Sequence, residues 1–563
     1  MLSLKTKKVD LLLCAFIVTL FFISHLMNFS IAPWNHNGLF DDAAWDIYFA
    51  KNHIFNGTPF QPAFFDPVGI ISREVVFHYY LSVFFVLFGY NLLVFNVSLL
   101  ILGCITVFFT TLLIQRLFNN MAVTMLSAVM LNFLPFHFMH VFRGDRYAIV
   151  APLMMISLYF LYTAFLHASF LRTAISAIFA ALCFGSAIMG KHYLYGVVLA
   201  ALLFLITDKN RKKISRKLPV ALVWLGSFLL AAAPMLIYIG SNYAIYTLRE
   251  RSLINEFFLQ YKQGGFQALI PYLDRVREIF FAKYSYLRQF VPGFYLIPLA
   301  YYLLLVPGLL IALLKRHFEI VFLALIPIVG AFISGAYDFR ILMAVPIWVV
   351  AMAFALNTLF VKKIVGVGLG LGIIVVGLLP SINYIWMVSR DPNYLYLLPH
   401  KDVAVSRLVQ DIVVGVINPT SEMKQDEFNR KVDLTSVSYD TLVCPLGAYA
   451  IMHVYLQNYN DKKILAFCDQ GIQLLKTPTE ILHDNIRAII NYSPTDKDLK
   501  LAWEVSEKSE GIVDKFRPYR QYGHEEEFKG EVDGVKYSLY VLTIDNEFIE
   551  QFKKEVVWGK LAL

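Results

Sequence analysis

Apolar runs long enough to cross a membrane recur through the first 388 residues and constrain the fold more than any other feature. A transmembrane helix needs about 20 mostly apolar residues to cross a hydrocarbon core of roughly 30 Å. The composition agrees, because 58% of the residues are hydrophobic and only 16% are charged, unlike the balance of a soluble domain. The sequence therefore predicts a polytopic α-helical membrane protein.

The runs predict about eleven transmembrane helices. They lie at residues 9–28, 92–115, 120–141, 148–168, 173–190, 193–207, 218–240, 293–314, 319–336, 341–360 and 364–388. The first run is long and lacks a clear small-residue cleavage site, so we interpret it as an uncleaved span rather than a signal peptide. An odd number of spans places the two termini on opposite sides of the membrane.

Basic residues give the orientation. Clusters at residues 5–8, 209–217, 315–316 and 362–363 all fall on one side, which the positive-inside rule assigns to the cytoplasm. The N-terminus is then cytoplasmic, and residues 29–90 form a long first outer loop. A shorter apolar run at residues 75–88 is interpreted as an interfacial helix, because counting it as a span would place the basic clusters outside.

The chain changes character after the last span. Residues 1–388 form the predicted transmembrane domain, and residues 389–563 are rich in charge without any run of spanning length. Their alternating strand and helix patterns predict a small extracytoplasmic α/β domain that contacts an acceptor or a partner. Its strands are expected at 441–444, 463–467 and 537–544, and its helices at 446–459 and 479–490.

Two of the five cysteines, Cys444 and Cys468, lie in this C-terminal part of the chain. In an oxidising compartment they could form a disulfide, and two buried free thiols are the alternative.

Two adjacent carboxylates, Asp41 and Asp42, open the most informative segment, GLFDDAAWDIYFAKNHIFNG. Residues 43–55 have the pattern of an amphipathic helix, which would hold the pair near its N-terminus. A solvated acidic loop is the plainer explanation of the pair. Other charged residues favour a site, because they gather in later loops on the same side, so near to hydrocarbon that they are expected to be paired or functional. They are Arg143, Asp145, Arg146, Lys191, His192, Asp338 and Arg340.

Four passages resemble the type C glycosyltransferases of membranes, in particular the bacterial branch related to protein O-mannosyltransferases and aminoarabinosyltransferases. DDAAWDIYFAKNHIFNG is similar to the first-loop pattern of that family, and residues 78–118 resemble its interfacial helix, glycine turn and second span. FRGDRYAIVAPLMMISLYFLYTAF and MGKHYLYGVVLAALLFL are similar to later junctions between loop and span. The resemblance covers about residues 9–388 and implies a GT-C-like fold in a bacterial inner membrane.

The resemblance implies a hexosyl- or pentosyltransferase that moves sugar from a polyprenyl-phosphate donor to a glycan, lipid or protein acceptor. Asp41 or Asp42 would be the general base, and Asp145 a second acidic residue that positions the acceptor or a divalent metal. The donor phosphate would be held by Arg143, Arg146, Lys191, His192 and Arg340. Substrate contacts would come from His78, Tyr79 and Tyr337.

The chain departs from the family pattern before the interfacial helix, where the family often has two prolines and residues 73–80 of this sequence read REVVFHYY. An aromatic anchor at the membrane interface is the competing interpretation of His78, Tyr79 and Tyr80. No cofactor is singled out, and metal dependence stays open, because distances between carboxylates cannot be read from a sequence.

Other functions are less consistent with the pattern. The net charge of +8 does not indicate nucleic-acid binding, because the basic residues sit in short clusters between spans. A lipid-glycan transporter or flippase would carry polar residues inside its spans and inverted repeats, whereas here the charges collect at one face. An envelope assembly protein remains a rival in which the acidic loop has no chemical role.

Overall fold

The computed structural model describes most of the helical part of the chain and five strands near its end. The described residues are 15, 17–19, 21–22, 46–47, 50, 63–64, 72–73, 75–89, 92–143, 146–207, 211–241, 243, 248–283, 294–333, 341, 343–361, 363–390, 441–445, 463–467, 499–505, 521, 523–532 and 535–544.

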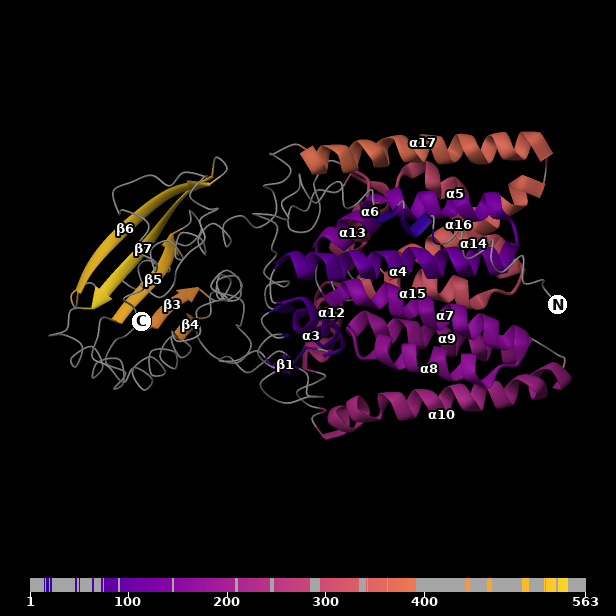
Figure 1. Cartoon of the computed structure of the whole chain (residues 1–563), viewed down its shortest axis with the longest axis horizontal. Helices are drawn as coiled ribbons and strands as arrows, with labels where there is room; N and C mark the ends of the chain where they lie inside the picture. Colours follow the sequence, from indigo (N-terminus) through magenta and orange to yellow (C-terminus); the bar gives the residue numbers. More distant parts are fainter. Residues whose placement is uncertain are drawn as a thin grey trace.

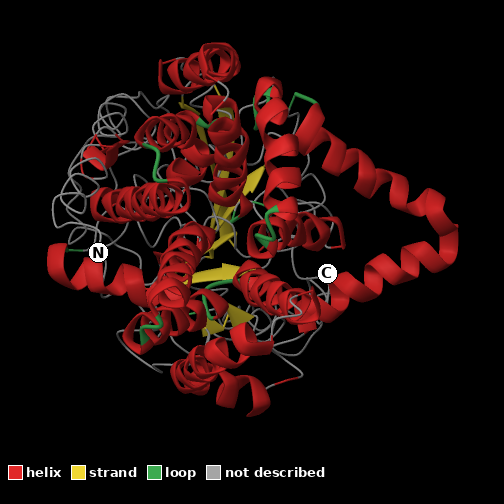
Figure 2. Ribbon diagram, turned by 90° about the vertical axis from the view of Figure 1, so that its right-hand side faces the viewer, coloured by secondary structure: helices red, strands yellow, loops and turns green. Residues whose placement is uncertain are grey.

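The helices run back and forth as a bundle, with their axes roughly parallel (Figure 1), and Figure 2 views the bundle nearly end on. The N-terminal half contains α3 (Val76–Phe88), α4 (Leu92–Phe118), α5 (Met121–Phe133), α6 (Pro135–Arg143), η2 (Arg146–Ile149), α7 (Val150–His167), α8 (Phe170–Phe184), α9 (Ile188–Thr207) and α10 (Arg211–Ser241). The next elements are α12 (Leu248–Gly264), η3 (Gly265–Leu269), α13 (Ile270–Phe281), η4 (Leu299–Tyr301), α14 (Tyr302–Leu314), α15 (Phe318–Ile333), α16 (Ala344–Val361) and α17 (Lys363–Arg390).

The prediction of a multi-pass helical membrane protein is confirmed. Among the described residues, five helices are long and apolar enough to cross a membrane, at Leu93–Phe118, Arg146–His167, Leu218–Ser241, Ala344–Val361 and Ile364–Trp386. Shorter apolar helices cover most of the other predicted spans. The first predicted span, 9–28, lies largely outside the described residues, so the number eleven stays a prediction.

Two predicted spans differ from the structure for local reasons. The run at 120–141 is two helices, α5 and α6, because Leu134 is extended (φ −69°, ψ 119°) and the ring of the following Pro135 disfavours a helical conformation there. The run at 173–190 contains the end of α8 and the start of α9, with a turn at Gly185 that closes α8.

The helix α16 forms the centre of the bundle, where it packs against α4, α5, α14, α15 and α17. Trp348 on α16 is 1% exposed, and its indole N–H donates a hydrogen bond to the Ala324 carbonyl of α15 at 3.1 Å. Helices α10 and α17 lie at the periphery (Figure 1) and expose most of their apolar surface, as expected for helices that face lipid.

Replacing Gly308 with alanine is expected to destabilise the protein by about 1–3 kcal/mol, because the new Cβ would overlap the Ala351 carbonyl oxygen of α16. This oxygen belongs to the helix backbone, which cannot move away from the new Cβ as a flexible side chain could. The apparent melting temperature of the purified protein measures the effect. Gly226→Ala on α10 is the matched control, since nothing lies within 4 Å of a Cβ there, and equal melting of both variants would contradict the expectation.

The C-terminal strands form one mixed sheet of β3 (Thr441–Pro445), β4 (Lys463–Phe467), β5 (Leu499–Val505), β6 (Gly523–Val532) and β7 (Val535–Ile544). The order is β4-β3-β5-β7-β6, with β3 parallel to both neighbours and β7 antiparallel to both of its neighbours. Three of these strands match the sequence prediction. The predicted helices at 446–459 and 479–490, together with Cys468, lie outside the described residues.

Candidate active site

A buried charged cluster joins three segments that are distant in the sequence. The carboxylate of Asp46, in the first loop, has its Oδ1 atom 3.0 Å from His78 Nε2 on α3. Its Oδ2 atom accepts a hydrogen bond from the Arg146 backbone N–H of η2 at 3.0 Å. The Arg146 guanidinium lies 3.7 Å from Oδ1. We call Asp46, His78, Arg146 and Tyr147 the Asp46 cluster.

Helix α3 places His78 in this cluster because its apolar residues recur at helical spacing. Phe77, Leu81 and Phe85 are buried on one face, and His78 and Ser82 are buried beside them. The Ser82 hydroxyl lies 2.8 Å from the Ala50 carbonyl oxygen of the first loop and 2.7 Å from the His78 carbonyl oxygen of its own helix, so its single hydrogen is shared between the two acceptors. His78 is fully buried.

The short helix η2 presents Arg146 to the first loop by its backbone as well as by its side chain. The Arg146 side chain is 4% exposed, and its Nη2 atom donates to the Tyr147 hydroxyl at 3.1 Å. The guanidinium carbon also lies 4.8 Å from the centre of the Tyr147 ring, within range of a cation–π contact. A buried charge needs such partners, because removal from water is costly unless hydrogen bonds and an opposite charge compensate.

Lys191 and His192, two predicted ligands of the donor phosphate, lie in the first turn of α9. Lys191 is buried, with 7% of its surface exposed. The His192 ring packs directly against Gly330 of α15, where a Cβ would overlap it.

Several predicted site residues are not described by the structure. Asp41, Asp42, Asp145, Tyr337 and Arg340 lie outside the described residues, and Arg143 is described only by its backbone, as the last residue of α6. Tyr79 is partly buried on α3. The roles of these residues stay predictions.

Asp46 and Tyr147 are the members of the cluster that the sequence analysis does not select. One signal for Asp46 is its place between Trp45 and Ile47 in an amphipathic segment, where a charged residue needs a partner. Within the described residues, no three His, Cys, Asp or Glu side chains are close enough together to hold a metal ion.

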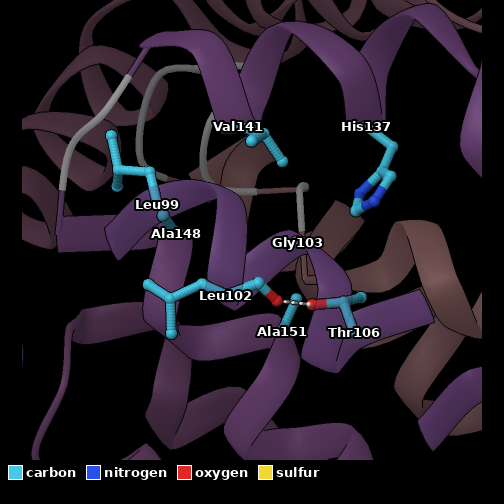
Figure 3. Close-up of a pocket in the computed structure, with 8 residues that line it drawn as sticks. All are labelled: Leu99, Leu102, Gly103, Thr106, His137, Val141, Ala148 and Ala151. Carbon is cyan, nitrogen blue, oxygen red and sulfur yellow. Dashed lines mark hydrogen bonds between the residues drawn. The ribbon is translucent and has the colours of Figure 1, made fainter. Parts of the chain in front are cut away.

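A small pocket lies between α4, α6 and the start of α7 (Figure 3). Its lining is Leu99, Leu102, Gly103, Thr106, His137, Val141, Ala148 and Ala151. The pocket has space for about one water molecule, so it is not the site of a sugar or a lipid head group.

Comparison with known proteins agrees with this architecture. Residues 72–238 match the family model described as dolichyl-phosphate-mannose-protein mannosyltransferase, and this segment contains His78, Arg146, Lys191 and His192. The matched segment and the fold are similar to those of type C membrane glycosyltransferases, so the resemblance seen in the sequence is confirmed.

Two crystal structures of ArnT from Cupriavidus metallidurans, one bound to undecaprenyl phosphate and one in the apo state, share this fold. Each is 12% identical to this chain with a TM-score of 0.52, and each match covers 96% of this chain and 98% of the other. No curated protein matches the chain significantly.

Proposed function

We propose that the protein is a glycosyltransferase that moves a hexose or pentose from a polyprenyl-phosphate donor to an acceptor on the extracytoplasmic face of the inner membrane. The observation that carries the proposal is the Asp46 cluster, which ties the first loop to α3 and η2. In the sequence, Asp46 follows Asp42 by four residues and Arg146 follows Asp145 by one. The cluster therefore connects the two segments that supply the proposed acidic residues.

The proposed reaction is a single displacement at the anomeric carbon. Asp41 or Asp42 removes the proton of an acceptor hydroxyl or amine, and the acceptor atom attacks the anomeric carbon. The bond between this carbon and the phosphate oxygen breaks, and polyprenyl phosphate leaves with the bonding electron pair. Asp145 positions the acceptor.

Asp46 itself is a positioning residue and not the base in this proposal. Both of its oxygens are engaged, Oδ1 by His78 and Oδ2 by the Arg146 N–H, and the guanidinium stabilises the ionised form. Because both oxygens already have partners within the protein, we assign proton transfer to Asp41 or Asp42.

Cations near the leaving phosphate would stabilise the charge that develops on it. We assign this role to Lys191, which is buried near the start of α9, with contributions from Arg143, Arg146, His192 and Arg340. The ArnT structure bound to undecaprenyl phosphate supports a polyprenyl phosphate as carrier. We propose that residues 389–563 form the extracytoplasmic domain that contacts the acceptor, whether glycan, lipid or protein.

Transfer from a panel of synthetic undecaprenyl-phosphate sugars to native membrane extracts tests the function. Wild-type protein is expected to transfer one of the sugars, and Lys191→Gln to reduce that transfer at least about tenfold, since a neutral amide stabilises an anionic leaving group poorly. Lys315→Gln is the matched control, because Lys315 lies in an exposed turn between α14 and α15.

The absence of transfer from every donor by folded wild-type protein would overturn the proposal. A parallel assay that follows the movement of a fluorescent lipid-linked sugar across vesicles would then identify the flippase alternative.

A further inference from the structure

The first turn of α9 is fixed by contacts on three sides. Gly190 lies so close to the end of α8 that a Cβ on it would overlap the Cys183 carbonyl. The His192 ring lies against Gly330 of α15. The Tyr193 hydroxyl donates a hydrogen bond to Ser157 Oγ of α7 at 2.8 Å. Three different helices therefore hold three residues of one turn.

These contacts determine where Lys191 points. Successive residues of an α-helix are about 100° apart around its axis, so Gly190, His192 and Tyr193 occupy three of the four directions in this turn. Lys191 takes the remaining direction, and its side chain is buried there. A rotation of α9 about its axis would move the Lys191 ammonium group and would also break the three contacts.

The Tyr193 contact is part of a larger network of hydrogen bonds. The Ser157 hydroxyl donates to the Ser176 carbonyl of α8 at 2.7 Å, and the Ser176 hydroxyl donates back to the Ser157 carbonyl at 2.8 Å. The Trp224 indole N–H of α10 donates to Ser176 Oγ at 3.1 Å. One network of four side chains thus joins α7, α8, α9 and α10.

The two serine hydroxyls are close to each other as well as to each other's carbonyls, with 3.2 Å between their Oγ atoms. Each hydroxyl can donate its single hydrogen to the opposite carbonyl and accept one hydrogen bond, from Tyr193 or from Trp224. Ser157, Ser176 and Tyr193 are fully buried, and water does not replace a lost partner inside a membrane bundle. The network therefore resists a change in the rotation of α9.

We propose that Tyr193, through its hydrogen bond to Ser157, is a positioning residue that holds Lys191 toward the phosphate of the lipid donor. The inference rests on the proposed function, because it assigns a purpose to the placement of Lys191. Ser157, Ser176 and Trp224 support the same role, because they form the rest of the hydrogen-bond network that includes Tyr193. The ligand class is a polyprenyl phosphate, which is both the leaving group and the carrier of the donor.

A double-mutant cycle on the full chain tests this role, with undecaprenyl phosphate as the probe. Its dissociation constant would be measured for wild type, Tyr193→Phe, Lys191→Gln and the double variant, each purified in nanodiscs. Tyr193→Phe keeps the ring and removes only the hydroxyl, so we expect binding about fivefold weaker. In the Lys191→Gln background the same change is expected to alter binding less than twofold, because the group that Tyr193 positions is already lost.

Tyr301→Phe is the matched control. Tyr301 is also fully buried, and its hydroxyl has no hydrogen-bond partner among the described residues, so its removal should leave the dissociation constant unchanged. Equal fold effects of Tyr193→Phe in both backgrounds, or an equal effect of Tyr301→Phe, would overturn the positioning role while the proposed function stands. A wild-type protein that does not bind undecaprenyl phosphate would overturn both.

Discussion

Replacement of Asp46 with alanine is expected to destabilise the protein by about 3–5 kcal/mol. The change removes the carboxylate that faces Arg146 and leaves a guanidinium that is 4% exposed without this counter-charge. Breaking a buried ion pair from one side is costly for this reason, even where the intact pair adds little stability. The His78 ring and the Arg146 backbone N–H would lose an acceptor as well. Thermal melting of the purified protein measures the effect.

The control for this experiment is Asp274→Ala on α13. Asp274 also pairs with an arginine, Arg277 at 3.3 Å, but both side chains are more than half exposed. An ion pair exposed to water contributes little to stability, so this variant should have the same melting temperature as wild type. If the Asp46→Ala variant also has the melting temperature of wild type, the Asp46 cluster does not hold the first loop in place.

Replacement of the proposed catalytic base with asparagine is expected to reduce sugar transfer by about 10²- to 10⁴-fold without lowering the melting temperature. Asparagine has nearly the same shape as aspartate but cannot accept the proton. Asp41→Asn, Asp42→Asn and Asp145→Asn would be compared at matched expression, by initial rates of transfer from the donor that wild type uses. The variant with the largest loss among the first two identifies the base.

This pattern differs from that expected for Asp46, where stability and activity should fall together. Full transfer activity in all three asparagine variants would contradict a catalytic role for the acidic loops and would favour the assembly-protein alternative.

The helices of the bundle could be predicted because a membrane span is a local pattern of about 20 residues. The break at Pro135 could not be predicted in the same way. Proline also occurs inside α10, α14, α15 and α17 without ending them, since neighbouring helices can compensate for the lost hydrogen bond. What separates α5 from α6 is the extended conformation of Leu134, the residue before Pro135.

The candidate site was predicted only in part because its contacts are not local. Arg146 and His78 stand out in the sequence as charged or polar residues between apolar runs. Their common partner, Asp46, is 32 residues from His78 and 100 residues from Arg146. Nothing in a single sequence indicates which of several acidic residues contacts which arginine or histidine. Strand β6 was missed for a different reason, because its sequence GHEEEFKGEV is highly charged, as is common at the edge of a sheet.

The separation of Asp46 and Arg146 by 100 residues also has a consequence for biogenesis. At about 5–20 residues per second, the ribosome makes Arg146 roughly 5–20 s after Asp46. During this interval Asp46 has no contact with Arg146. The contacts between Asp46 and η2 therefore form only after the chain has been extended to Arg146.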